Sequence, residues 1–589
     1  MAEQRTSSSY DLVIQGATVI DGTGTPAQTA DIAIHNGRIA AVGRLAATNA
    51  IRTIDADGAL VTPGFVDIHA HYDGQVAWDS RLTPSSWHGV TTTIMGNCGV
   101  GFAPVRAKDH DALIELMEGV EDIPGTALHA GIPWGWESFG EYLDAIDRPF
   151  DIDVGAQVPH GAVRLYVMGQ RGADREPATP DDIGRMGELV ADGVRAGAFG
   201  FTTSRTRNHR TSRGEYTPSL TAEADELIGI AKAMGATGRG VLEVVSDFLD
   251  VDEEFATLRA MVEASGRPLS VSIAQSDRKP DTPWRLLEHL EQANADGLAM
   301  TGQVPARAIG ILLGLELTLH PFMLSPTMKA LNTLPLGTRV RELRKPDNKA
   351  RILSEKPRDD GGMLAFRRFD AMFVLGDPPD YEPPPHTSVA ALAARDGREP
   401  DDLAYDLLLE DEGHAFLYLP FLNYVGGNLD AARRLLSHQH TVVGLADGGA
   451  HVGTICDASF PTTMLAHWGR DRTRGDRLEI AHIVERMTSA PARAVGLPDR
   501  GALREGMRAD INVIDLDRLA LRPPELQYDL PAGGRRLVQR ATGYLHTFVN
   551  GVETYANGES TGTLPGRLVR SGNGRGTDSR GTNNSTGAA

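Results

Sequence analysis

The stretch Val61–His71 reads Val-Thr-Pro-Gly-Phe-Val-Asp-Ile-His-Ala-His. Its residues 65–68 predict a strand, and His69 and His71 follow at the end of that strand. Residues two apart on a strand point to the same side, so we expect both imidazoles to face one space. Two neutral imidazoles held in this way suit a zinc-like metal. The stretch therefore predicts a metal site at the end of a strand.

A second pair of histidines with the same spacing, His438 and His440, lies in a polar stretch just before another predicted strand. Short motifs recur by chance, so the surrounding residues must decide how each one is interpreted. The polar surroundings favour a solvated loop for this second pair.

Strands and helices alternate over several hundred residues around the first pair. A helix start is predicted at Thr179, which precedes Pro180 and two acidic residues. Further helices are predicted near 222–234, 253–264 and 283–296, and β-like runs near 240–245, 268–273 and 441–445. Such alternation predicts a parallel sheet, either a barrel or a doubly wound fold. No strand is followed by a glycine-rich dinucleotide-binding or phosphate-binding motif, which favours the barrel.

Both ends of the chain show a different pattern, in which short apolar runs are separated by turn residues. The segment His35-Asn36-Gly37 predicts a hairpin, because Asn-Gly tolerates the positive φ of a tight turn. The same β-like pattern returns from Gly501. Charges and prolines cluster over 336–414, which indicates an insertion. From 565 onward Gly, Ser, Arg, Asn and Thr predominate, which predicts a disordered tail.

Composition limits the partners of the chain. Its 589 residues include 58 Lys and Arg against 78 Asp and Glu, a formal net charge of −20. This acidic balance argues against nucleic acid or an anionic membrane as the partner. The sequence shows neither a secretory signal nor an apolar run long enough for a membrane span. Two cysteines cannot form a disulfide framework, and we expect a cytoplasmic protein.

Cys98 and Asp447 each follow an apolar or β-branched run that predicts a strand. A thiol at a strand end is a candidate metal ligand, although a free cysteine is more often a small buried apolar residue. A carboxylate at a strand end can bind metal and take a proton from water, and the alternative for Asp447-Gly is an ordinary turn. Cys456 has no such context and is interpreted as structural.

The loop after residues 200–204 is rich in cationic side chains. Arginine can bind a carboxylate through two hydrogen bonds, so Arg205, Arg207 and His209 are predicted to bind substrate. The alternative is a solvated loop. His451, four residues after Asp447, is included in the same substrate-binding prediction.

Several longer segments match one known family. They are 19–24 (VIDGTG), 63–73 (PGFVDIHAHYD), 96–104 (GNCGVGFAP), 134–143 (WGWESFGEYL) and 506–515 (GMRADINVID). On these segments the chain resembles the amidohydrolase superfamily and, within it, the D-aminoacylase or N-acyl-D-amino-acid deacylase branch.

The resemblance implies a TIM barrel, (β/α)8, of the amidohydrolase type, with a small β-sandwich domain built from both chain termini. It places the metal site at the C-terminal mouth of the barrel strands. The boundaries predicted from it and from the composition are 1–61 and 501–564 for the two parts of the sandwich, 62–335 and 415–500 for the barrel, 336–414 for the insertion and 565–589 for the tail.

The resemblance also implies a set of metal ligands. By motif these are His69, His71, Cys98 and Asp447. Two further histidines of the family are absent, and the chain has Glu243 and Gln275 at their expected places, either as metal ligands or as polar barrel lining. The implied cofactor is one zinc ion, or two, and a single metal on the two histidines and Asp447 is preferred.

The activity implied is that of a hydrolase acting on non-peptide C–N bonds of linear amides. The expected substrate is an N-acyl amino acid or related N-acyl compound, with Asp447 as general base and then general acid. The alternatives are a cyclic amide or an ester or lactone as substrate, or a catalytically silent binding barrel because two histidines are missing. The expected partner is a small molecule, with no nucleic acid or membrane, and a homo-oligomer is left open.

Overall fold

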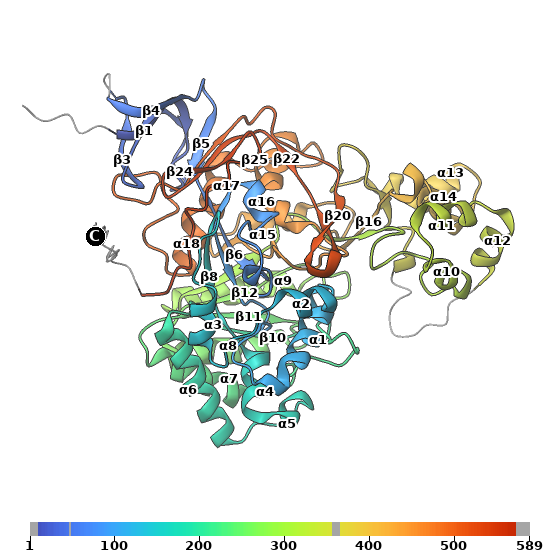
Figure 1. Cartoon of the computed structure of the whole chain (residues 1–589), viewed down its shortest axis with the longest axis horizontal. Coiled ribbons are helices and arrows are strands. Elements are labelled where there is room, and N and C mark those ends of the chain that lie inside the picture. The colour runs from blue at the N-terminus through green and yellow to red at the C-terminus, as the bar shows by residue number, and fades with distance from the viewer. Residues whose placement is uncertain (1–9, 46–48, 356–365, 573–589) are drawn as a thin grey trace, which may run out of the picture.

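The computed structural model describes residues 10–45, 49–355 and 366–572 (Figure 1). Three parts are distinct in this view (Figure 1). A sheet lies at one end of the molecule, strands alternate with helices in the central part, and a helical excursion lies at the right. In the described ranges, no helix is long and apolar enough to cross a membrane.

Strands from both ends of the chain form one sheet of nine strands. Its order is β25-β24-β23-β18-β5-β1-β2-β3, and β4 pairs with β1. The strands are β1 (Tyr10–Val19), β2 (Gln28–His35), β3 (Arg38–Gly43), β4 (Ala50–Asp55), β5 (Leu60–Pro63), β18 (Ile511–Ile514), β23 (Tyr544–Val549), β24 (Val552–Ala556) and β25 (Glu559–Ser560). Two further pairs join β19 (Ala520–Leu521) to β22 (Ala541–Thr542) and β20 (Glu525–Leu530) to β21 (Gly534–Val538).

The hairpin between β2 and β3 is the one predicted from the sequence. Asn36 and Gly37 form its turn with φ of 50° and 71°, both in the left-handed region that a two-residue hairpin turn requires. A Cβ at position 37 would also lie 2.5 Å from the side chain of Asn550, so glycine is needed for space as well. Alternate residues of the sheet, such as Ile14, Ile32 and Val513, are fully buried in one apolar cluster.

The middle of the chain forms parallel strands in two sheets, of order β6-β7-β8 and β17-β13-β12-β11-β10-β9. The strands are β6 (Phe65–Ala70), β7 (Val90–Met95), β8 (Asp153–Ala156), β9 (Val158–Pro159), β10 (Gly200–Arg205), β11 (Val241–Ser246), β12 (Leu269–Ser272), β13 (Met300–Val304) and β17 (Thr441–Val443). Only Gln157 separates β8 from β9. At the other edge, Ala70 of β6 pairs in parallel with Gly448, just beyond β17. The predicted parallel sheet is confirmed.

Helices connect these strands in the central part of the molecule (Figure 1). They are α1 (His110–Glu121), α2 (Gly125–Gly131), α3 (Phe139–Ala145), α4 (His160–Met168), α5 (Gln170–Ala173), α6 (Pro180–Ala196), α7 (Ala224–Gly235), α8 (Val251–Ser265), α9 (Thr282–Ala295), α15 (Asp430–Leu436), α16 (Phe460–Thr463), α17 (Ile480–Met487) and α18 (Ser489–Ala494). Helix α6 starts where predicted: the Thr179 hydroxyl accepts from the amide of Asp182, whose side chain accepts from the amide of Thr179. Such a cap is worth about 1 kcal/mol.

A helical excursion leaves the parallel sheet between β13 and β17, although these two strands are direct neighbours. Its elements are β14 (Ile309–Leu313), α10 (Pro326–Leu331), α11 (Leu336–Leu343), α12 (Pro346–Ser354), β15 (Phe373–Val374), α13 (Val389–Arg395), α14 (Pro400–Leu407) and β16 (Leu417–Leu422). It has its own apolar core, which includes Val340, Leu343 and Tyr405. Because β14 pairs with β16, the excursion extends on both sides of the predicted 336–414.

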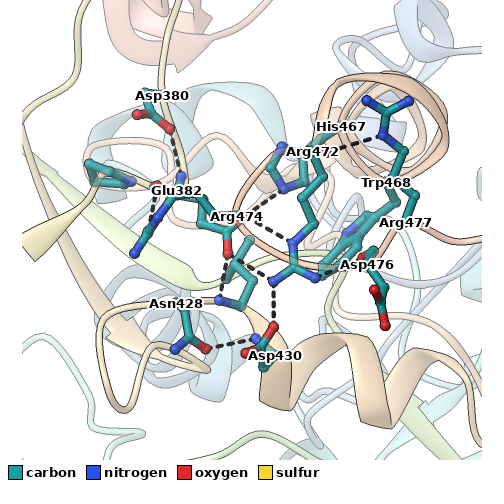
Figure 2. A network of polar contacts seen from close by, with 12 residues as sticks. Asp380, Glu382, Asn428, Asp430, His467, Trp468, Arg472, Arg474, Asp476 and Arg477 are labelled. Carbon is teal, nitrogen blue, oxygen red and sulfur yellow. Dashed lines mark hydrogen bonds and ion pairs between the residues drawn. The ribbon is translucent and has the colours of Figure 1, made fainter.

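Charged side chains around the buried residues Glu382 and Arg472 link the excursion to the rest of the molecule (Figure 2). We call Glu382, Asp430, His467, Arg472 and Arg474 the Glu382–Arg472 network. The Glu382 carboxylate accepts from Nη2 and Nε of Arg472 at 3.0 and 3.1 Å and from Nε2 of His467 at 3.1 Å. Arg472 also donates to Asp430 at 2.7 Å, at the start of α15. Burial alone would raise the pKa of Glu382, but the hydrogen bonds from His467 and Arg472 outweigh it and lower the pKa to about 2.

Residues 565–572 are ordered, which corrects the predicted disordered tail from 565. Gly566 pairs with Phe150 and Leu568 with Val154 at the end of the parallel strands, and the amide of Ser571 donates to Gly197. Leu568 is buried. The prediction used the average composition of the tail, in which a single apolar residue has little weight. The remainder of the predicted tail, 573–589, lies outside the described residues.

Candidate metal centre

His69 and His71 lie together at the end of β6, as predicted. Both side chains are completely buried, and their ring centroids are 5.5 Å apart. His69 is the last but one residue of β6, and His71 follows that strand directly. The amide of His71 donates to the carbonyl of Gly448, so the backbone after β17 holds this end of the strand.

Cys98 joins the two histidines from the loop after β7. Its Sγ lies 3.3 Å from Nε2 of His69. One ligand atom from each of His69, His71 and Cys98 fits within 4.8 Å of the other two. The thiol thus points into the space shared by the imidazoles, which is the placement that the metal-ligand interpretation requires.

Asp447 approaches the same space from beyond β17. Its Oδ1 lies 3.5 Å from Nε2 of His69 and 3.7 Å from Nε2 of His71. Ligand atoms about 2.0–2.3 Å from a zinc ion stand about 3.3–3.8 Å apart at the corners of a tetrahedron. Three separations among these nitrogen, sulfur and oxygen atoms, 3.3, 3.5 and 3.7 Å, lie within that range.

The backbone at these positions is unusual. Cys98, Asp447 and His451 are not glycines, yet their φ angles are 55°, 48° and 50°. Left-handed conformations of such residues cost on the order of 1–3 kcal/mol each and cluster at functional sites. The loops after β7 and β17 are thus held in place by their surroundings.

Two residues of the centre were not predicted from the sequence. Oε1 of Glu121, the last residue of α1, lies 3.2 Å from Nδ1 of His71, and its Oε2 lies 3.6 Å from Nε2 of His451. Oε1 of Gln303, on β13, lies 2.9 Å from Nδ1 of His69. Gln303 could have been found from the sequence, because it is a polar residue inside an apolar strand. Glu121 could not, because nothing in the neighbouring sequence distinguishes it from the exposed acidic residues of its helix.

Glu243 and Gln275 are placed differently. Oε2 of Glu243 accepts from the amide of Cys98 at 3.1 Å, and its Oε1 lies 4.0 Å from Nδ1 of His69. Glu243 therefore borders the centre. Gln275 instead donates through Nε2 to the carbonyl of Pro280 in its own loop, and its backbone exchanges hydrogen bonds with Asn423. These partners all lie outside the cluster of His69, His71, Cys98 and Asp447.

The predicted substrate-binding residues also divide. Arg205 pairs with Glu254, and Arg207 is exposed with its amide bonded to Asp247, so neither guanidinium joins the cluster. Nδ1 of His209 is bonded to Ser204, and burial followed by the charge of His451 lowers the pKa of His209 to about 3. His451 is 24% exposed, with Nε2 3.9 Å from Oδ2 of Asp447. Of the four, His451 lies within 4 Å of carboxylate oxygens of the centre, and the charge of His451 acts on His209.

The electrostatics of the centre favour a cation. Burial lowers the pKa of His69 to about 4 and raises that of Glu243 to about 8. Burial would lower the pKa of His71, but the carboxylates of Glu121 and Asp447 raise it to about 9. Burial would raise the pKa of Asp447, but His71 and His69 hold it well below its ordinary value. The carboxylates of Glu121 and Asp447 thus favour positive charge at His71.

Several buried atoms of the centre have no hydrogen-bond partner among the described residues. They are Nδ1 of His71, Oδ1 of Asp447, Oε1 of Glu243 and both carboxylate oxygens of Glu121. Buried polar atoms are rarely left unpaired, because each costs about 1–3 kcal/mol. The donor types, their spacing and these unpaired atoms together fit a zinc ion.

Comparison with known proteins supports the same interpretation. A family model described as the amidohydrolase family matches residues 52–559. The N-acyl-D-glutamate deacylase of Alcaligenes xylosoxydans xylosoxydans is 28% identical over 567 residues, which are 95% of this chain and 96% of that protein. The D-aminoacylase of the same organism is 25% identical over 570 residues, 96% of this chain and 99% of that protein. The resemblance to this branch is confirmed.

A solved structure is similar over its full length. The N-acyl-D-glutamate deacylase of Bordetella bronchiseptica, crystallised with zinc and a phosphonate inhibitor, aligns with 95% of this chain and 100% of its own at a TM-score of 0.61 and 24% identity. This likeness shows that the chain has the amidohydrolase type of fold.

Proposed function

Because the chain belongs to the amidohydrolase family, we propose that it is a metal-dependent hydrolase of a non-peptide amide C–N bond. The substrate we propose is an N-acyl amino acid or a related N-acyl compound. One observation carries the proposal: two imidazoles, a thiol and a carboxylate converge on one buried space at the ends of parallel strands. Barrel enzymes place their chemistry at that end of the strands.

The names of the relatives support the choice of a linear amide. Both full-length relatives named above are deacylases or aminoacylases, and another from the same organism is an N-acyl-D-aspartate deacylase at 26% identity. Their names favour this reaction over the cyclic amides, esters and lactones considered from the sequence.

The residues that would hold the metal are His69, His71, Cys98 and Asp447. A zinc ion bound there supplies a Lewis acid that polarises a carbonyl and makes water more acidic. We propose one zinc ion, since the hydrogen bonds of Gln275 within the described part of the chain go to Asn423 and Pro280 and not to the cluster. Glu243 is then a buried neighbour of the metal, and its carboxylate holds the loop at Cys98 by accepting from the backbone amide of Cys98.

Asp447 is the proposed general base and acid. Its pKa is held below the ordinary value, so the carboxylate is ionised at neutral pH and can accept a proton from the attacking water. It then returns that proton to the leaving nitrogen. His451 borders Asp447, and both His451 and His209 are proposed to contact the substrate.

We also infer the finer architecture. The parallel strands, with β8 and β9 counted as one, are proposed to close into a (β/α)8 barrel through the pairing of Ala70 with Gly448. The sheet shared by the chain ends is proposed to belong to a separate sandwich domain. The domain boundaries, the cytoplasmic location and a homo-oligomeric state stay predictions.

The test begins with elemental analysis of the purified full chain and a panel of N-acyl-D- and N-acyl-L-amino acids. We expect about one zinc per chain and hydrolysis of at least one linear amide. Replacing His69→Ala together with His71→Ala should remove zinc and activity. The matched control is His438→Ala with His440→Ala, the other pair of the same spacing, which should change neither.

A second pair of variants tests the thiol. Cys98→Ala should reduce the zinc bound, whereas Cys456→Ala should not, because Cys456 is buried away from the cluster. A metal-free chain that hydrolyses nothing in a broad amide and ester panel would overturn the proposed function and leave the silent binding barrel.

A further inference from the structure

Gln303 is the polar residue of β13 that faces the buried interior, and it is 1% exposed. Its side chain touches His69 on one side and β12 on the other. Oε1 lies 2.9 Å from Nδ1 of His69, and Nε2 donates to Oγ of Ser270 at 2.8 Å. The amide therefore presents its carbonyl oxygen, not its amino group, to the imidazole.

The orientation of this amide decides where the proton of His69 sits. A carbonyl oxygen can only accept, so Nδ1 of His69 must carry the hydrogen. A neutral imidazole carries one hydrogen, which leaves the lone pair on Nε2. Nε2 is the atom that lies 3.3 Å from Sγ of Cys98 and 3.5 Å from Oδ1 of Asp447.

The position of the Gln303 side chain is itself fixed. A Cβ added at Gly444 would lie 2.7 Å from Oε1 of Gln303 and 2.9 Å from its Cβ, so the backbone after β17 packs directly against it. Gly444, Ser270 and His69 therefore hold the amide from three sides.

From this geometry we propose that Gln303 is a positioning residue, which fixes His69 in the tautomer that offers Nε2 to the metal. The inference rests on the proposed metal-dependent function. Outer partners of this kind commonly orient metal-binding histidines, and removing one typically costs 10–100-fold in metal affinity. Oε1 of Glu121 lies 3.2 Å from Nδ1 of His71, and Nε2 of the same ring lies 3.7 Å from Oδ1 of Asp447.

The use of an amide at His69 has a chemical reason. Three carboxyl groups, those of Glu121, Glu243 and Asp447, already surround the space. An amide accepts from Nδ1 of His69 through its oxygen and donates to Oγ of Ser270 through its nitrogen, whereas a carboxylate has no donor for Ser270.

The experiment measures zinc affinity of the metal-free full chain by competition with a chromophoric chelator. Gln303→Met keeps the length of the side chain and removes the acceptor, and Gln303→Asn keeps the amide but shortens its reach. We expect each to weaken zinc binding about 10–100-fold. Gln303→Glu restores an acceptor and should bind within a few-fold of the parent chain. Gln539→Ala, which alters a buried glutamine bonded to Ser459 and Tyr381, is the matched control and should leave the affinity unchanged.

A second measurement reports the tautomer directly. The ¹⁵N spectrum of the metal-free chain labelled at histidine, with the His69 signal assigned by its loss in His69→Ala, should show hydrogen on Nδ1. In Gln303→Met that pattern should be lost. Unchanged affinity in both Gln303→Met and Gln303→Asn, or hydrogen on Nε2 in the parent chain, would overturn the inference. Failure of the parent chain itself to bind zinc overturns the proposed function instead, and the spectrum still decides the tautomer.

Discussion

The metal centre and the Glu382–Arg472 network are both buried clusters of charge, and each joins segments far apart in the chain. They differ in how completely their polar atoms are paired. The Glu382 carboxylate accepts four hydrogen bonds, from Leu429, His467 and twice from Arg472. At the metal centre, Oδ1 of Asp447 and both carboxylate oxygens of Glu121 accept none among the described residues.

This difference helps to distinguish a charge network that stabilises the fold from a cluster that binds a ligand. A complete set of partners stabilises the fold and leaves nothing for a ligand to do. An incomplete set is costly in the free protein and is relieved when a ligand arrives. The comparison can therefore be tested by removing one member from each cluster.

The largest effect is expected at Asp447. Asp447→Asn should lower kcat/KM on the preferred N-acyl substrate by about 10²–10⁴-fold, because the proton acceptor is lost. The variant should still fold, because Asn keeps the size of the side chain and Oδ1 has no hydrogen bond to lose among the described residues. Steady-state kinetics and thermal unfolding check both parts, and activity near that of the parent chain would contradict the assignment.

The opposite pattern is expected at Arg472. Arg472→Met leaves Glu382 buried without its charged partner, which should cost about 3–5 kcal/mol in the free energy of unfolding. Activity per folded molecule should be preserved at low temperature. Urea unfolding measures the loss, and the double change Arg472→Met with Glu382→Leu should recover most of it. Additive losses in the double variant would show that the two residues do not act together.

Much of the centre could be predicted from the sequence, for a physical reason. His69, His71, Cys98 and Asp447 stand at the ends of predicted strands, and parallel strands bring such ends together. Glu121 could not be predicted, because its role depends on where α1 meets the loop after β17. The prediction that Arg205 binds substrate failed for the same reason, because Arg205 forms an ion pair with Glu254, a residue of another element.

The fold shows the same division. The hairpin at Asn36-Gly37 and the start of α6 depend on neighbouring residues and were predicted correctly. The extent of the excursion depends on the pairing of β14 with β16 across about a hundred residues of chain, and pairing between distant segments leaves no local pattern.

A third test uses the pH dependence of stability to compare two buried groups, His88, which has no charged partner among its hydrogen bonds, and Glu382, which has Arg472. Burial lowers the pKa of His88, bonded to Thr462 and Gln539, from 6.5 to about 4. Between these values the unfolded chain binds a proton that the folded chain does not, so stability falls as pH drops from 6.5 toward 4. The expected loss by pH 5 is about 2 kcal/mol. Glu382, with its pKa lowered to about 2, contributes stability that persists until pH falls below 4.5.

Unfolding curves at pH 7 and pH 5 measure this loss. His88→Gln keeps a donor for the carbonyl of Gln539 and has no titrating group, so its loss on acidification should be smaller than that of the parent chain. An equal loss in both would assign the pH dependence to other groups.

The smallest effect is expected at the edge of the network. The Asp430 side chain is 64% exposed, although it receives a 2.7 Å hydrogen bond from Arg472. Exposed ion pairs contribute about 0–1 kcal/mol, so Asp430→Asn should shift stability by less than that. A loss as large as that of Arg472→Met would show that the network acts as one unit out to its exposed end.

The pairing of β5 with β18 has a consequence for how the protein is made. Residues 60–63 emerge from the ribosome early, but their partners, residues 511–514, emerge several hundred residues later. At about 5–20 residues per second, that interval is on the order of 20–90 s. For that time one edge of β5 has no partner, and an unpaired edge can join other chains. The terminal sheet is therefore completed only near the end of synthesis, and the nascent chain needs protection at β5 until then.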